Sequence, residues 1–444
     1  MSAGTGTPRL AALDLVEGFA GSPDTPLSAM IEIADRCNEV CVHCYQVQGQ
    51  KGEMTTEQLH RVMDELASMG VLFLTLSGGE PTLRPDFLDL VAYARKLRFA
   101  VRVFTNGLTM TEELARSLSE LAVQWVEISL YSHRPEVHDW ITRVPGSWAK
   151  SSEGVRRLSA HGVAVIVKAP AMRLTADDLP AWAEYVRSLG ADYRIDSTLD
   201  AREDGDRTPE ALNVTPAQLH GILTDPSIGG AESPPVPPAR ADSAFVCGAC
   251  RGGIHIEPDG EVRPCTSLEV ALGNAVTDGL SASWARGDRA RAIRGLAWRD
   301  LHGCRDCDLR HYCKRCFATA RHDEGDALGP YRAACSGAIA HYRASHGVHP
   351  RLAPPPTPER DPSIGPYRKV GDHAFEPIPD VRTQADEALA HELGWTRRDR
   401  VERAPDAIVP GELVQIRRPG KKPGLEQVPA ASVGADRAEP GGHA

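Results

Sequence analysis

The sequence predicts an α/β fold in two parts, a partial (β/α)6 TIM-like barrel followed by a small cysteine-rich α+β domain. Six apolar, β-rich runs alternate with helical segments between residues 28 and 200. Eight of the eleven cysteines crowd into residues 247–335. At 444 residues with 41% hydrophobic side chains, the chain can bury a large core and hold two or three domains.

The predicted strands look buried and are separated by helices, so we expect a parallel sheet with right-handed crossovers. Six β/α units are too few to close an eight-stranded barrel, so the sheet should stay partly open. Thr55 and Gln58 form a capping-box pattern, and Gly70 marks the end of the helix that they begin. The strands are expected at residues 28–33, 71–76, 100–104, 124–130, 163–169 and 191–196.

Proline-rich stretches mark the expected domain boundaries. We expect an N-terminal extension (1–27), the barrel (28–225), a linker (226–240), the cysteine-rich domain (241–345) and a largely disordered, proline-rich tail (346–444). Within the tail, residues 383–394 have the pattern of an amphipathic helix, and residues 407–418 that of a short hairpin.

Charge and hydropathy exclude several classes of protein. The net charge of −10 argues against a nucleic-acid-binding surface. The N-terminus lacks the basic start and apolar run of a secretory signal, and we find no stretch of about 18 apolar residues that would cross a membrane. We therefore expect a cytoplasmic protein. A disulfide framework is disfavoured, because the chain is long and its CxxC spacings suit metal binding.

Three cysteines directly follow the first predicted strand, in the spacing C-x3-C-x2-C. One loop that carries Cys37, Cys41 and Cys44 can ligate three irons of a 4Fe–4S cluster and leave the fourth iron without a protein ligand. Structural zinc sites prefer CxxC pairs. The triplet resembles the signature of the radical S-adenosylmethionine (SAM) superfamily. That resemblance implies that SAM chelates the open iron, beside His43 and Tyr45, and that one electron cleaves it to methionine and a 5′-deoxyadenosyl radical.

Two further loops fall at ends of predicted strands. Gly78 and Gly79 let the backbone approach a ligand closely, and Glu80 can accept hydrogen bonds from an ammonium group. This Gly-Gly-Glu run resembles the superfamily's motif for the methionine end of SAM, although alone it is a common strand–helix turn. Thr105 and Asn106 begin a Thr-Asn-Gly turn that resembles the family turn bordering the cofactor.

The fourth predicted strand ends close to further candidates. By resemblance to the family pattern, Ser129 binds the ribose or carboxylate of SAM, and Arg143 pairs with the carboxylate. Ser129 also fits as a small residue on a buried strand. His138 and Asp139 also fit as a packing pair at a helix start. At the fifth strand, Lys168 and Met172 are alternative candidates to face the reaction chamber, and Lys168 is equally consistent with a solvated lysine.

The cysteines of the second domain follow a pattern of their own. Gly260 lies in the turn of a predicted hairpin at 254–265, which brings flanking cysteines together. The block resembles the SPASM domain, the auxiliary-cluster module of peptide-modifying radical SAM enzymes. That resemblance implies two auxiliary clusters, ligated by Cys247, Cys250, Cys265 and Cys316 (auxiliary I) and by Cys304, Cys307, Cys313 and Cys335 (auxiliary II).

Two departures from that pattern affect the ligand assignment. Only two residues separate Cys313 from Cys316 where three are usual, and family members often have glycine in place of Cys250. If Cys250 is not a ligand, auxiliary I has an open iron. A four-thiolate zinc site built from the two CxxC pairs is the alternative for this block.

The resemblance implies a maturase that modifies a ribosomal peptide or a protein, with three 4Fe–4S clusters and SAM. Thr266 and Ser267 follow Cys265 where anaerobic sulfatase-maturing enzymes carry a catalytic aspartate, which disfavours that subfamily. A haem-pathway oxidase acting on a tetrapyrrole is one alternative, and an iron–sulfur or zinc-stabilised peptide-binding protein is another. The expected electron donor is a protein such as flavodoxin or ferredoxin. Residues 1–27 are too few for a winged-helix domain, so we expect the leader peptide to be recognised by a separate leader-peptide-binding protein, by the tail, or not at all.

Overall fold

A computed structural model describes residues 25–352, 365–378, 383–393 and 395. The first six strands pair in parallel and in chain order, which confirms the predicted parallel sheet. Each strand lies within a few residues of its expected position. They are β1 (Ser28–Ala34), β2 (Phe73–Gly78), β3 (Ala100–Thr105), β4 (Trp125–Ser129), β5 (Val165–Pro170) and β6 (Asp192–Asp196).

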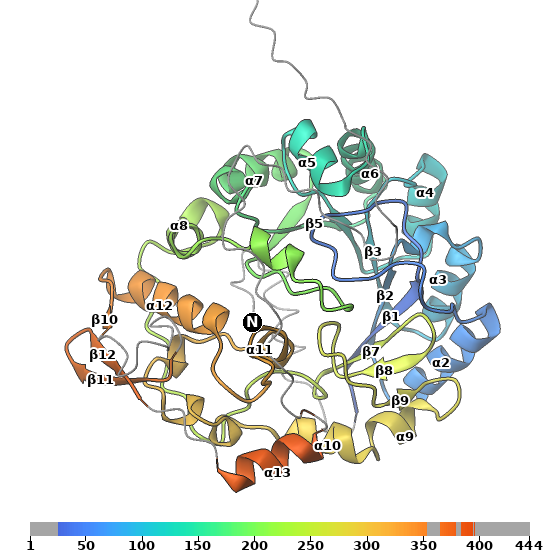
Figure 1. Cartoon of the computed structure of the whole chain (residues 1–444). Coiled ribbons are helices and arrows are strands. Elements are labelled where there is room, and N and C mark those ends of the chain that lie inside the picture. The colour runs from blue at the N-terminus through green and yellow to red at the C-terminus, as the bar shows by residue number, and fades with distance from the viewer. Residues whose placement is uncertain (1–24, 353–364, 379–382, 394, 396–444) are drawn as a thin grey trace, which may run out of the picture. The chain divides into compact units, whose positions relative to one another are not determined.

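Helices cover the outer side of this arc of strands (Figure 1). The Thr55–Gln58 capping box is present at the start of α2, and Gly70 follows that helix with a φ of +88°. The helices α2, α3, α4 and α7 each bury an apolar stripe, as amphipathic helices do. The covering helices are α2 (Thr56–Ser68), α3 (Phe87–Lys96), α4 (Glu112–Glu120), α5 (Pro135–Thr142), α6 (Ser147–Ala160) and α7 (Leu179–Ser188).

The predicted hairpin at 254–265 is confirmed, but it joins the barrel sheet. Its first strand, β7 (Gly253–Ile256), pairs in parallel with β1, and β8 (Glu261–Arg263) and β9 (Gly273–Asn274) extend the sheet in antiparallel fashion. The nine strands therefore form one sheet in the order β6-β5-β4-β3-β2-β1-β7-β8-β9. The expected linker region (226–240) begins with the short helix η4 (Pro226–Ile228), and the parts on either side of it share this sheet.

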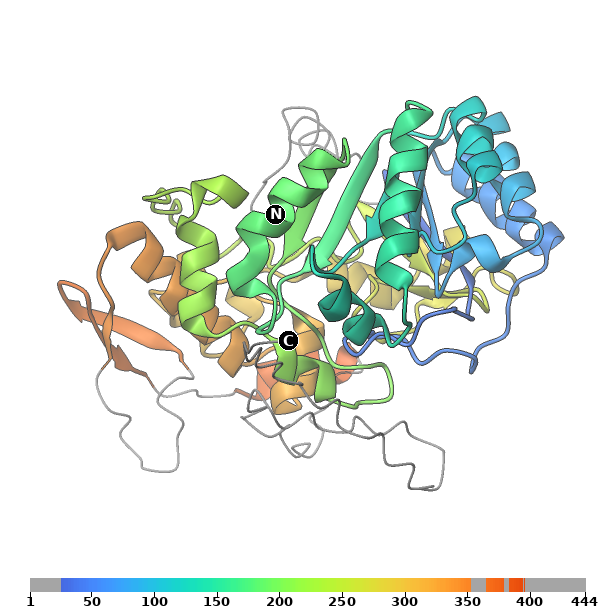
Figure 2. The ribbon, with the colours of Figure 1, turned by 90° about the horizontal axis from the view of Figure 1, so that it is seen from above.

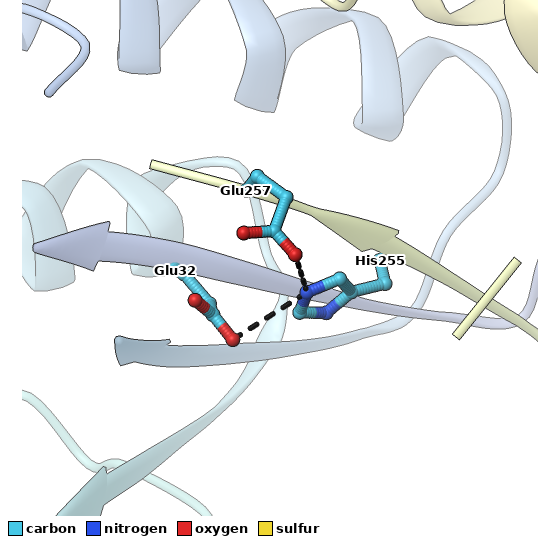
Figure 3. A group of neighbouring side chains, drawn as sticks. All are labelled: Glu32, His255 and Glu257. Atoms are coloured by element: carbon cyan, nitrogen blue, oxygen red, sulfur yellow. Dashed lines mark hydrogen bonds and ion pairs between the residues drawn. The ribbon is translucent and has the colours of Figure 1, made fainter. Parts of the chain in front are cut away.

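A buried charged cluster lies where β1 meets β7 (Figure 3). The His255 Nε2 atom is 3.4 Å from Glu32 Oε1 and 3.1 Å from Glu257 Oε1, and the three residues are almost fully buried. Glu257 also forms ion pairs with Lys51 and, at 2.7 Å, with Arg263. These two cations already neutralise Glu257, and Glu32 is engaged by His255 and by the side chains of Tyr45 and Gln46. We therefore interpret the cluster as an ion-pair network that holds β7 to β1.

Within the network, the pKa values of Glu32 and Glu257 shift in opposite directions. Burial raises the pKa of Glu32, opposed by the nearby His255. Burial alone would also raise the pKa of Glu257, but the hydrogen bond and charge of His255 and the charge of Arg263 outweigh it and lower the pKa to about 2. Glu257 is thus the carboxylate that is held ionised between cations.

The second half of the chain is built from short helices around the remaining cysteines. Its longest helix, α12 (Arg332–His346), carries Cys335 and lies against α8 (Pro216–Thr224). The other helices are α9 (Leu280–Trp284), α10 (Asp288–Gly295) and α11 (Phe317–Glu324). Short 3-10 helices lie in connections of both halves of the chain. In the first half they are η1 (Pro81–Leu83), η2 (Ala176–Asp178) and η3 (Thr208–Leu212), and in the second half η5 (Trp298–Asp300), η6 (Cys304–Asp306) and η7 (Arg310–Tyr312).

The described part of the tail is more regular than the sequence predicts. The strands β10 (Arg351–Leu352), β11 (Tyr367–Gly371) and β12 (Ala374–Pro377) form a small sheet in a segment expected to be largely disordered. The helix expected at 383–394 is present as α13 (Gln384–Glu392), with a capping box at Thr383. The hairpin expected at 407–418 and the extension 1–24 lie outside the described residues.

Figure 2, turned from the view of Figure 1, shows α12 and the β10–β12 sheet beside each other. Within the described part of the chain, every helix is too short or too polar to span a bilayer.

Replacing Glu257 with glutamine should destabilise the protein strongly. The change leaves Lys51, Arg263 and His255 without their shared carboxylate, and breaking a buried ion pair costs about 3–5 kcal/mol. Urea denaturation at pH 7 measures this loss. The matched control is Glu261→Gln, which removes a half-exposed partner of the same arginine and should cost less than about 1 kcal/mol.

The pH dependence of that difference follows from the lowered pKa of Glu257. Stabilisation by this carboxylate is fully present above its ordinary pKa of 4.5 and is lost as the pH falls through about 2. The stability gap between wild type and Glu257→Gln should therefore shrink as acid is added. A gap that stays constant down to pH 2 would contradict the assignment.

Candidate active site and metal centres

The loop after β1 brings the first three cysteines together. The Cys37 Sγ atom accepts a hydrogen bond from the Glu39 amide at 3.4 Å, and Cys41 Sγ lies 3.3 Å from Glu39 Oε2. Burial raises the pKa of Cys37 to about 12 and that of Cys44 to about 11. Thiols that burial holds in the protonated form become thiolates when a metal takes the place of the proton. This donor set fits a cluster.

Two glycines at the end of β2 hold this loop by close backbone contact. The Gly79 amide donates to Ala34 O at 2.8 Å, and the Glu80 amide donates to Arg36 O at 2.9 Å. A Cβ atom on Gly78 would lie 2.3 Å from Ala34 O, and one on Gly79 would lie 2.4 Å from Arg36 O. Both positions therefore require glycine before any ligand is considered.

Glu80 is fully buried and binds its own neighbours. Its Oε1 atom accepts from Thr82 and, at 2.7 Å, from the Thr105 hydroxyl, while Oε2 accepts from the Asn106 amide at 2.7 Å. It does not line the cavity described below. In this structure Glu80 fixes the Thr-Asn-Gly turn relative to the Gly-Gly turn. Its expected contact with SAM stays a prediction.

Asn106 connects that turn to the cysteine loop. Its side-chain amide donates to Asn38 Oδ1 at 2.6 Å and lies 3.8 Å from Cys37 Sγ. Thr105 and Asn106 both line the cavity, as expected for residues that border the cofactor.

Tyr131 is a site residue that the sequence analysis did not select. Its hydroxyl lies 3.9 Å from Cys41 Sγ, and its ring meets the His43 ring edge-on at 4.5 Å between centroids. His138 stacks on the other side and accepts the Tyr131 amide at Nδ1. Burial lowers the pKa of His138 to about 4, so it is a neutral acceptor at pH 7. His138 thus positions Tyr131, and only the fold brings these two rings to the cysteine loop.

The remaining candidates after β4 divide into two groups. Ser129 lines the cavity. Arg143 does not: it ends α5 with a φ of +62°, and its guanidinium packs over the Trp140 ring at 4.5 Å. Asp139 accepts from the Gly146 and Trp148 amides and caps α6, which agrees with the packing interpretation. The role of Arg143 at the SAM carboxylate stays a prediction, and in this structure Arg143 does not line the cavity.

The eight later cysteines form two groups. Burial raises the pKa of Cys247, and it raises the pKa of Cys265 to about 12; the nearby Cys316 thiol adds to both shifts. Burial also raises the pKa of Cys250 to about 12, with Cys265 and Cys247 beside it. Burial raises the pKa of Cys335, and so do the neighbouring thiols of its own group, which are Cys313, Cys304 and Cys307. This grouping is the one implied for auxiliary I and auxiliary II.

A cavity of about 1520 Å³ connects the first cysteine triplet with auxiliary I. Cys37, Cys41 and Cys44 line one part of its wall, and Cys247 and Cys316 line another. Pockets for a single small molecule usually measure about 300–1,000 Å³. This cavity therefore exceeds what SAM alone needs.

Seven of the nine residues expected to bind SAM line this cavity. They are His43, Tyr45, Gly78, Gly79, Thr105, Asn106 and Ser129. The hydroxyl of Tyr45 donates to Glu32 at 2.9 Å, so the charged network beside β7 also fixes a wall of the cavity. Lys168 lines the cavity and lies 3.2 Å from Asp196, whereas Met172 is fully buried elsewhere.

One carboxylate bridges the two halves of the cavity wall. Asp200, in the chain after β6, accepts from the Ser267 hydroxyl at 2.9 Å and from the Thr319 hydroxyl at 2.7 Å. Ser267 follows Cys265 by two residues, and Thr319 follows Cys316 by three. The sequence gives no sign of this contact, because its partners lie far apart along the chain.

Comparisons with known proteins agree with this geometry. Family models match in two places: the radical SAM superfamily over residues 31–186 and an iron–sulfur cluster-binding domain, SPASM, over residues 247–316. The mycofactocin maturase MftC of Mycobacterium ulcerans is 30% identical over 358 residues, which cover 76% of this chain and 96% of the relative. PqqA peptide cyclase of Ruegeria pomeroyi is 26% identical, over 74% of this chain and 92% of the relative.

A solved structure shares the fold at low identity. Streptococcus suis SuiB bound to precursor peptide SuiA aligns with a TM-score of 0.52 and 14% identity, over 65% of this chain and 70% of that one. Together the matches show that this chain belongs to the radical SAM superfamily and carries a SPASM domain. It is an enzyme of that superfamily, whose cofactors are SAM and 4Fe–4S clusters.

Gly79→Ala should remove the first cluster while the rest of the protein stays loaded. The added methyl group meets the Arg36 carbonyl at 2.4 Å, so the cysteine loop has to move. Iron analysis after anaerobic reconstitution should show a loss of about four irons per chain. Gly52→Ala is the control, because its methyl group meets no atom within 4 Å. Full iron loading of Gly79→Ala would show that the close contact does not position the loop.

Proposed function

We propose that this enzyme is a maturase that modifies a ribosomally made peptide, which it binds in the 1520 Å³ cavity. The single observation that carries the proposal is that one large cavity is lined both by the first cysteine triplet and by cysteines of the auxiliary I group. A site that only stored or relayed electrons would not need this volume beside an open iron.

Cys37, Cys41 and Cys44 would hold the SAM-binding cluster, with His43, Tyr45 and Asn106 beside it. When bound and reduced by one electron, this centre cleaves SAM to methionine and a 5′-deoxyadenosyl radical that takes a hydrogen atom from the substrate. The chain's residues enclose that position. The Tyr131 ring packs against His43 of the loop, and its hydroxyl lies 3.9 Å from Cys41 Sγ, so Tyr131 would cover this side of the cluster.

The remaining space has the character of a peptide site. The helix α8 turns Leu219, Ile222 and Leu223 toward the cavity, and none of its residues is fully buried. Polar and charged side chains, among them Lys168 and Asp200, lie across from this apolar wall. Mixed apolar and polar walls of this kind suit a peptide segment with several side chains.

The auxiliary clusters would take up the electron left after hydrogen abstraction. Cys247 and Cys316 would hold auxiliary I at the cavity wall, where it would supply an acceptor for that electron, and Cys313 of the second group also lines the cavity. An electron donor such as flavodoxin or ferredoxin would reduce the SAM-binding cluster. A separate leader-binding protein is a further proposed partner.

The relatives support a peptide as substrate. Two of them are named for peptide or maturation chemistry, mycofactocin maturase and PqqA peptide cyclase, and SuiB was solved with a precursor peptide. Thioether formation, carbon–carbon crosslinking, epimerisation and decarboxylation all begin with hydrogen abstraction, and the proposal is limited to that shared step.

A triple variant tests the catalytic part. Wild-type protein, reconstituted anaerobically, should contain about twelve irons per chain and release 5′-deoxyadenosine from SAM under dithionite. The Cys37→Ala/Cys41→Ala/Cys44→Ala variant should keep about eight irons, which shows that it folds, and release none. Zinc in place of iron, or equal SAM cleavage by both proteins, would reject the proposal.

The substrate is tested by mass spectrometry. Short peptides encoded beside the gene should change in mass with wild type and SAM, and stay unchanged with the triple variant. Conversion of a tetrapyrrole, with no peptide modified, would instead favour the haem-pathway alternative.

A further inference from the structure

A segment of the tail passes over the cysteines of auxiliary II. Residues 365–377, which we call the strap, include β11, β12 and the turn between them. The strap lies beyond the last cysteine, and its neighbours in space are Cys307, Cys335 and the chain around Asp308.

Two backbone amides of the strap point at cysteine sulfurs. The Gly365 amide donates to Cys335 Sγ at 3.2 Å, and the Tyr367 amide donates to Cys307 Sγ at 3.4 Å. Both sulfurs belong to the same group of four. Hydrogen bonds from the second shell orient metal ligands and tune the centre that they hold.

Contacts that do not involve sulfur fix the strap in this position. The Asp308 amide donates to Tyr367 O at 2.8 Å, and Asp308 Oδ2 accepts the Lys369 amide at 2.7 Å. Tyr367 and Phe375 are almost fully buried. The His373 ring accepts or donates at 2.6 Å to the Tyr342 hydroxyl of α12, the helix that carries Cys335.

The strap also closes the space between the cysteines. Cys304, Cys307, Cys313 and Cys335 surround a small cavity with few polar atoms on its wall. Pro366 and Tyr367 form one side of this cavity. Access of water is one of the factors that set the reduction potential of an iron–sulfur cluster.

The helix after the strap is anchored to the same cysteine segment. Arg305, between Cys304 and Cys307, forms a double ion pair with Asp386 of α13 at 3.1 and 3.2 Å. Trp395 packs on Phe317, the residue after Cys316, with 5.3 Å between ring centroids. The tail thus contacts both ends of the segment 304–317, which contains four of the auxiliary cysteines.

We propose that the strap is part of the auxiliary II site, where its Gly365 and Tyr367 amides tune the potential of the cluster and its side chains shield it from solvent. The proposal depends on the cluster assignment but not on SAM cleavage or on the peptide substrate. Its test therefore uses the Cys37→Ala/Cys41→Ala/Cys44→Ala protein, which carries only the two auxiliary clusters.

Gly365→Ala is the test substitution in that background. Its Cβ would lie 2.9 Å from the Tyr367 ring and 3.5 Å from Cys335 Sγ, so the Gly365 backbone and the Tyr367 ring cannot both keep their positions. Each of these two residues carries an amide that donates to a cysteine sulfur. Loss of a hydrogen bond to a thiolate disfavours the more negative, reduced cluster. In a redox titration followed by electron paramagnetic resonance, one of two midpoint potentials should become more negative. Gly371→Ala is the matched control, because its Cβ meets only Ala374 Cβ at 3.8 Å.

A second readout follows the release of iron to a chelator. The four irons of auxiliary II should leave about 10-fold faster in Gly365→Ala, in line with the usual effect of losing an outer-shell partner, and at the parental rate in Gly371→Ala. Asp308→Ala, which removes the acceptor of the Lys369 amide, should act in the same direction if Gly365→Ala fails to load iron. Unchanged potentials and release rates in both variants, or equal changes at both clusters, would overturn the proposal.

Discussion

The position of β1 between β2 and β7 is the constraint on which the site depends. Its carboxyl end carries the cysteine loop, the β2 side supplies the two glycine contacts that fix that loop, and the β7 side brings in the second cysteine domain. The carboxyl ends of β1 and β2 meet at one edge of the sheet, so their loops reach the same cavity. The segments before β7 and after β8 bring Cys247, Thr266 and Ser267 to it. The buried Glu32–His255–Glu257 network is what holds the β7 side in register.

Much of this arrangement could be predicted from sequence, because the signals are local. The six strands are continuous apolar runs, the capping box lies within four residues, and the cysteine spacings are fixed by cluster geometry. Spacing alone does not pair the auxiliary cysteines, and their assignment as ligands of two clusters stays a prediction.

What could not be predicted depends on contacts between distant segments. Neither the pairing of β7 with β1 nor the bridge from Asp200 to Ser267 leaves a local pattern in the chain. The same is true of the strap, whose composition resembles that of disordered sequence but whose amides find sulfur acceptors. Glu80 shows that a recognisable motif does not reveal every partner of its side chain. The sequence predicts a contact with SAM, whereas in the structure the Glu80 carboxylate accepts hydrogen bonds from Thr105 and Asn106.

The place of the strap along the chain has a consequence for how the protein is made. The fourth ligand of auxiliary II, Cys335, is synthesised about thirty residues before the amide of Gly365 that covers it. The four thiols therefore precede their cover in the chain. Iron and sulfide would reach them most easily before the strap has packed over the site. In a finished chain that has lost this cluster, refilling would first require the strap to open.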